Sequence, residues 1–129
     1  MDAMNDTQKE FLEILVYLFL RYNKFDEALA LSLILAEYFP EDSQVNLSLA
    51  FAALQTGTPG TAIDAIKAAE SLVKSRDRKK LFFILKSKTL WALGQDMDAR
   101  SAYTRFLGMQ EQDLRLAIAC PKSKTKAVS

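Results

Sequence analysis

Asn23-Lys24-Phe25-Asp26-Glu27-Ala28, Gly57-Thr58-Pro59-Gly60-Thr61-Ala62 and Gly94-Gln95-Asp96-Met97-Asp98-Ala99 are three versions of one pattern. Each segment begins with a residue that readily adopts a left-handed backbone conformation, five positions before an alanine that opens an apolar helical pattern. The alanines stand at positions 28, 62 and 99, so the repeat length is 34 and then 37 residues. A period of about 34 residues is typical of helix-turn-helix solenoids, in which stacked repeats share one continuous core. This architecture favours a binding function over a catalytic one.

The apolar periodicity between these segments predicts an all-α fold, and strand signals are absent throughout. We expect three helical hairpins, each made of two antiparallel helices, in a right-handed solenoid with a short C-terminal capping helix. The predicted helices cover residues 7–21, 25–38, 44–56, 59–73, 81–93 and 96–108, with the cap at 113–120. In the cap, Leu114, Leu116 and Ile118 are expected to cover the exposed end of the last hairpin.

The domain is therefore expected to span residues 1–120, with repeats at about 9–42, 43–76 and 80–113 followed by the cap. Residues 121–129 carry three lysines and few apolar side chains, which predicts a disordered basic tail. The charged segment between the second and third hairpins is expected to be a solvated junction, since it contains Asp77 and no stacking aromatic residues.

The composition excludes several classes of function. The chain has 129 residues, with 17 Lys and Arg against 16 Asp and Glu, so no overall field attracts a nucleic acid or an anionic membrane. It has no histidine, which removes the usual general base and the commonest zinc ligand. It also lacks a glycine-rich phosphate loop. We therefore expect neither enzymatic activity nor a cofactor or metal.

The expected location is the cytoplasm. The first six residues lack the basic start and apolar core of a signal peptide. The longest apolar stretch, Ile14 to Leu20, is much shorter than the roughly 20 residues that span a bilayer, so no membrane insertion is expected. The single cysteine, Cys120, excludes an internal disulfide and is consistent with a reducing compartment.

The repeat resembles the tetratricopeptide repeat over roughly residues 9 to 112. On the alanine register, small or apolar residues stand at the eighth position of each repeat: Val16, Ala50 and Ser87. The close-packed alanines of the second helices are Ala28, Ala62 and Ala99. The chain departs from the family pattern at Lys86, where an apolar residue is expected, and at Phe106, where a small one is typical.

Among small tetratricopeptide proteins, the chain is similar to the cytosolic chaperones of bacterial type III secretion, which contribute to virulence. The similarity is closest at Gln8-Lys9-Glu10-Phe11-Leu12 and at Asp98-Ala99-Arg100-Ser101-Ala102-Tyr103-Thr104-Arg105-Phe106-Leu107. Both segments resemble the chaperone of a small early-secreted export component, the partner given the letter X. The resemblance implies a role in protein transport, in which the pair docks on the cytosolic ring of the export gate. The needle-subunit chaperone of the same system is the nearest alternative.

The resemblance also implies a concave groove lined by the first helix of each hairpin, at its fifth, ninth and twelfth positions. These positions hold Glu13, Leu47 and Ile84, then Tyr17, Phe51 and Lys88, then Leu20, Leu54 and Trp91. Seven of these nine side chains are apolar or aromatic. We predict that Tyr17, Leu20, Leu47, Phe51, Leu54, Ile84, Lys88 and Trp91 contact a partner, and that the partner presents an apolar helical segment.

Two other interpretations remain open. Aromatic residues at helical spacing are often ordinary packing residues, so individual members of this set could belong to the core. The chain could also be a generic tetratricopeptide scaffold, in which the groove or an end face binds another copy. Recognition of a C-terminal carboxylate is disfavoured, because Lys88 is the only basic residue in the set.

Overall fold

The computed structural model describes residues 4–119, and the predicted tail and Cys120 lie outside this range. Within it the chain forms six helices and no strand, which confirms the all-α class. The helices are α1 (Asp6–Arg21), α2 (Phe25–Tyr38), α3 (Ser43–Gln55), α4 (Pro59–Glu70), α5 (Arg76–Ala92) and α6 (Asp96–Ala119). None of these helices is both long and apolar enough to cross a lipid bilayer.

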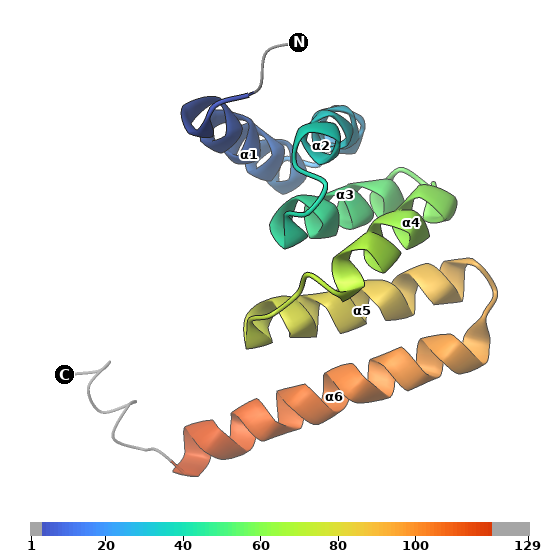
Figure 1. Ribbon diagram of the computed structural model, residues 1–129. Helices are drawn as coiled ribbons and strands as arrows, with labels where there is room; N and C mark the ends of the chain where they lie inside the picture. The colour runs from blue at the N-terminus through green and yellow to red at the C-terminus, as the bar shows by residue number, and fades with distance from the viewer. Residues whose placement is uncertain (1–3, 120–129) are drawn as a thin grey trace.

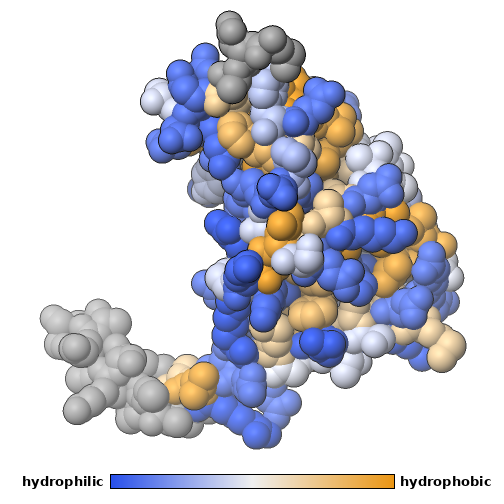
Figure 2. Space-filling view, in the orientation of Figure 1, coloured by the Kyte–Doolittle hydropathy of each residue, from blue (hydrophilic) through white to orange (hydrophobic). Residues whose placement is uncertain are grey.

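The helices pack as three consecutive hairpins, α1–α2, α3–α4 and α5–α6, arranged in a stack with α1 and α2 at one end and α6 at the other (Figure 1). Each helix contacts the helices next to it in the sequence. The other contacts among the described helices join α3 to α1 and to α5, so the first helices of successive hairpins adjoin. In the view of Figure 2, apolar side chains are visible among polar ones near the end of the stack where α1 and α2 lie.

The turn inside each hairpin has the predicted backbone conformation. Asn23, Gly57 and Gly94 have φ of 62°, 77° and 80°, which are left-handed values. Of the common amino acids, Gly and Asn adopt this region at the lowest cost, so these residues allow the chain to leave one helix and enter the next within a few residues.

The helix starts follow from local capping. Asn5 and Gln8 form a reciprocal capping box at the start of α1. The side chain of Asp42 accepts hydrogen bonds from the backbone N–H groups of Gln44 and Val45 at the start of α3. Pro59 occupies the first turn of α4, where no backbone N–H is needed.

The core is densest in the middle of the molecule. Its larger cluster joins α3, α4 and α5 through residues such as Leu47, Ile66 and Phe82, and a smaller one joins Val16, Leu35 and Val45. The repeat alanines Ala28, Ala62 and Ala99 are all buried, as are Val16, Ala50 and Ser87. The sequence register therefore identified core positions correctly.

The prediction of a separate capping helix is wrong. α6 continues without a break from Asp96 to Ala119, and Gly108 lies inside it. Leu114 and Leu116 are well exposed, so they do not cover the last hairpin. The extension instead lies against the start of α5, where the Arg76 guanidinium donates to the Met109 carbonyl oxygen and to the Asp113 carboxylate.

The start of α5 also differs from the prediction, because the helix begins at Arg76 and not at Leu81. The Ser75 side chain caps it by accepting a hydrogen bond from the Arg78 backbone N–H. The segment expected to be a solvated junction therefore contributes the first turn of a helix. Lys80, just after that turn, reaches Asp113 of α6 at 2.6 Å.

Candidate partner-binding groove

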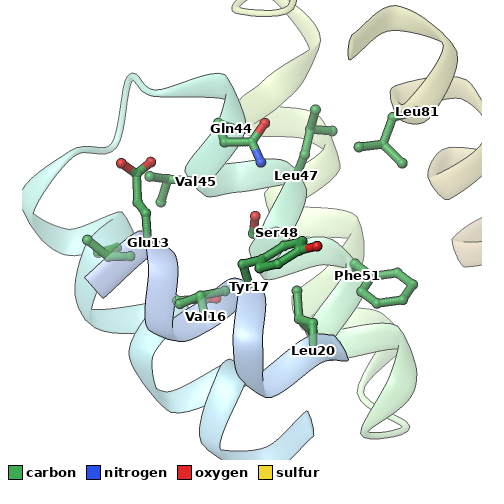
Figure 3. Close-up of a pocket in the computed structure, with 12 residues that line it drawn as sticks. Glu13, Val16, Tyr17, Leu20, Gln44, Val45, Leu47, Ser48, Phe51 and Leu81 are labelled. Atoms are coloured by element: carbon green, nitrogen blue, oxygen red, sulfur yellow. The ribbon is translucent and has the colours of Figure 1, made fainter. Parts of the chain in front are cut away.

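The first helices of the three hairpins enclose an open cavity of about 280 Å³ (Figure 3). Its lining is mostly apolar and comes from four helices: Glu13, Val16, Tyr17 and Leu20 from α1, Ser32 and Leu35 from α2, Gln44, Val45, Leu47, Ser48 and Phe51 from α3, and Leu81 from α5. We call it the first cavity. It brings together four of the predicted contact residues, Tyr17, Leu20, Leu47 and Phe51.

Tyr17 and Phe51 are the aromatic residues of the first cavity. Tyr17 projects from α1 toward the α3 side (Figure 3), and 59% of its surface is exposed. Its hydroxyl oxygen accepts a hydrogen bond from Arg21, one turn along α1. The Phe51 ring packs edge-on against Phe25, with 6.3 Å between the ring centroids. Both rings are thus oriented by protein contacts while part of their surface remains available.

The other predicted residues lie elsewhere. Ile84, Lys88 and Trp91 line a second, more open cavity of about 370 Å³ between α5 and α6, where Arg100 and Tyr103 complete the wall. Leu54 lines neither of these two cavities and packs, partly buried, against the central core. Leu47 is almost fully buried and forms the floor of the first cavity in addition to its role in the core.

Sequence reasoning missed Gln44, Ser48 and Leu81 as lining residues of the first cavity. Gln44 and Leu81 stand three residues before Leu47 and Ile84, which is one helical turn earlier on the same face. Extending the inward stripe by one turn would have identified both. The sequence contains no comparable signal for Arg100 and Tyr103, because they come from a second helix of a hairpin.

Four polar side chains interrupt the apolar lining of the first cavity: Glu13, Ser32, Gln44 and Ser48. Ser32 is only 1% exposed, and its hydroxyl has no hydrogen-bond partner. A buried hydroxyl without a partner loses about 1–3 kcal/mol relative to a satisfied one.

Glu13 places a carboxyl group in the α1 wall of the first cavity. Burial raises the pKa of the Glu13 carboxyl, while the neighbouring Lys9 ammonium acts in the opposite direction. A partly desolvated carboxylate is stabilised by an incoming cation. The cavity wall is therefore suited to a mainly apolar helix that carries a Lys or Arg near one edge.

One turn before Glu13 on α1, the Lys9 ammonium contacts the carboxylate of Asp42 at the start of α3, with 2.5 Å between Nζ and Oδ2. Burial raises the pKa of Asp42, but the hydrogen bonds from Lys9, Val45 and Gln44 outweigh it and leave that pKa lowered. The hydrogen bond to Asp42 raises the pKa of Lys9 against the effect of desolvation. This pair fixes the spacing of two walls of the first cavity.

Among the described residues, no group of three or more histidine, cysteine, aspartate or glutamate side chains is placed to hold a metal ion. The first cavity combines concavity, one exposed and one partly buried aromatic ring, and an apolar floor, which together favour binding of an apolar helix.

No protein-family model matches this sequence, and no curated protein matches it at a significant level.

Proposed function

We propose that this chain is a cytoplasmic chaperone of a type III secretion system, built on tetratricopeptide-like hairpins in a right-handed solenoid. In this role it holds an apolar helical segment of a small secreted export component, which keeps that component from assembling or aggregating before export. The function is binding and not catalysis. Delivery to the cytosolic ring of the export gate belongs to the same proposal.

The observation that carries the proposal is the first cavity, with the exposed Tyr17 ring and the partly buried Phe51 ring above the buried floor at Leu47. An aromatic ring that stays exposed above an apolar floor gains free energy when a second apolar surface covers it. The adjoining first helices, α1, α3 and α5, support the solenoid part of the proposal. The Glu13 carboxylate at the wall of the first cavity would fix the register of the bound segment.

The test is copurification of the tagged chain from cells that carry an intact secretion operon. We expect the wild-type chain to retain one small secreted protein, and its identity separates the X component from the needle subunit. A Tyr17→Ala/Phe51→Ala variant is expected to bind that purified protein at least about a hundredfold more weakly, because each aromatic anchor contributes about 2 kcal/mol. Circular dichroism verifies that the variant remains helical.

Two further variants make the result specific. Leu114→Ala/Leu116→Ala removes from α6 two apolar side chains about as exposed as Tyr17 and is expected to leave affinity unchanged. Trp91→Ala tests the second cavity, and a loss of affinity there means that the bound segment extends from the first cavity to α5 and α6. A wild-type chain that retains no secreted protein overturns the chaperone proposal. A helical Tyr17→Ala/Phe51→Ala variant that binds normally overturns the proposal that the first cavity binds the partner.

A further inference from the structure

α1 carries a second apolar surface, on the side facing away from the first cavity. Phe11, Ile14, Leu18 and Tyr22 follow one another at spacings of three, four and four residues, so they form one stripe along the helix. Their exposed fractions are 60%, 57%, 39% and 68%. We call this surface the outer stripe. It is roughly 16 Å long at the helical rise of 1.5 Å per residue.

No described helix covers the outer stripe. α1 contacts α2 and α3, and its other sides face away from the stack. Val16, which faces the core, is the only buried residue of α1. Near the N-terminal end of the outer stripe, Phe11 and Tyr38 line an open hollow. Large apolar side chains that adjoin over three turns differ from scattered surface residues and mark an interaction surface.

The charges beside the outer stripe indicate what covers it. Glu10 and Arg21 are exposed and lie on the same flank of the stripe, three turns apart. The midpoint between Glu10 and Arg21 falls next to Val16. The midpoints between Phe11 and Tyr22, and between Ile14 and Leu18, fall there too. The stripe and its charges are therefore symmetric about the middle of the helix.

This symmetry fits a second copy of α1 packed antiparallel across the stripe. A two-fold axis that passes the outer stripe at the level of residue 16, on the face opposite the buried Val16 side chain, would place Glu10 of each chain opposite Arg21 of the other. It would also place Phe11 opposite Tyr22 and Ile14 opposite Leu18. A parallel pair would instead set Glu10 against Glu10 and Arg21 against Arg21, and like charges at such positions are destabilising.

We propose that the outer stripe binds a second copy of this chain as an isologous, antiparallel α1–α1 pair. The proposal does not depend on the proposed chaperone function. Glu13, Val16 and Leu20 line the first cavity from the opposite side of α1, whereas Tyr17 adjoins the flank that carries Arg21.

The test is sedimentation of the purified full chain over a range of concentrations, together with charge-reversal variants. We expect a reversible monomer–dimer equilibrium for the wild type. Glu10→Arg and Arg21→Glu are each expected to raise the dissociation constant at least about tenfold, because each creates two like-charge contacts in a two-fold dimer. The double variant Glu10→Arg/Arg21→Glu restores opposite charges in the antiparallel pair and is expected to recover dimerisation.

Two controls keep the test specific to the outer stripe. Glu37→Arg reverses an exposed charge on α2 and is expected to leave the dissociation constant unchanged. Ile14→Glu places a charge in the centre of the stripe and is expected to abolish the dimer while the circular dichroism spectrum stays helical.

The proposal is overturned if the wild-type chain stays monomeric at all concentrations, or if the dimer tolerates Ile14→Glu. It is also overturned if the double variant fails to recover dimerisation, or if the outer stripe becomes buried only in a complex with another protein.

Discussion

α1 and α3 are both first helices of a hairpin and both are rich in apolar residues, yet they are used differently. α3 has 13 residues, and eight of them are buried. α1 has 16 residues, and only Val16 is buried. α3 is surrounded by α1, α2, α4 and α5, whereas α1 lies at the end of the stack with neighbours on one side. Apolar density in a helix thus predicts that it will be covered, and the position in the stack decides whether the same chain covers it.

The largest expected effect comes from truncating α3. Leu49 is buried in the central cluster, so Leu49→Ala removes packed atoms and leaves a cavity. We expect the free energy of unfolding to fall by about 2–5 kcal/mol. The matched change on α1, Ile14→Ala, should alter it by less than about 0.5 kcal/mol in the monomer, because Ile14 is exposed.

Urea unfolding followed by circular dichroism measures both variants, at a dilution at which sedimentation shows a monomer. Equal losses for Leu49→Ala and Ile14→Ala would contradict the contrast between the two helices.

A smaller effect is expected at the junction between α1 and α3. Asp42→Ala removes the cap of α3 and the partner of Lys9, and we expect it to lower the free energy of unfolding by about 0.5–2 kcal/mol at neutral pH. Asp42→Asn keeps an oxygen that can cap the helix but loses the charge, so it should retain part of this stability. If Asp42→Ala and Asp42→Asn lower the free energy of unfolding equally, the ion pair with Lys9, and not the helix cap, is the source of the stabilisation.

The same residue predicts a pH dependence. The folded-state pKa of Asp42 is lowered, so its contribution is complete above the ordinary carboxyl pKa of about 3.9 and is lost as the pH falls through the lower, folded-state value. Because the folded-state pKa of Lys9 is raised, Lys9 stays charged up to the alkaline range. Its contribution to stability is lost only as the pH rises through that folded-state pKa. We expect the stability difference between wild type and Asp42→Ala to shrink in acid, measured by unfolding at a series of pH values.

The smallest effect is expected at the far end of the stack. Asp113 pairs with both Arg76 and Lys80, and these hydrogen bonds hold its pKa below the usual range. Asp113→Asn should speed amide hydrogen exchange in the last turns of α6 and leave the global unfolding midpoint unchanged. Exchange rates in α6 that stay at the wild-type value would show that these ion pairs do not hold the extension. Glu111→Gln, whose partner Arg115 lies on α6 itself, is the control.

Sequence reasoning worked best where single residues have strong backbone preferences. The three hairpin turns were predicted from Asn23, Gly57 and Gly94, and the structure has left-handed values there. It failed at α5 and α6 because long-range contacts decide those boundaries. Arg76 and Lys80 carry no apolar periodicity, but their contacts with Asp113 stabilise the first turn of α5 and the extension of α6 together.

The candidate groove was predicted only in part, for a similar reason. Tyr17 and Phe51 were identified by combining the repeat register of the first helices with the inward positions that the family resemblance implies. The position of Trp91 depends also on α6, which places Tyr103 beside it and creates a separate cavity. Leu54 turns out to pack against the core because α3 is enclosed, and the repeat register does not encode that enclosure.

The restriction of contacts to near neighbours also has a consequence for synthesis of the chain. Every contact between helices joins elements that are adjacent, or one helix apart, in the sequence. Closing such short loops costs little chain entropy, and proteins of this kind fold fast. The contacts of α1 are complete once α3 has left the ribosome. The first cavity can therefore take shape, apart from Leu81, while α5 and α6 are still being translated.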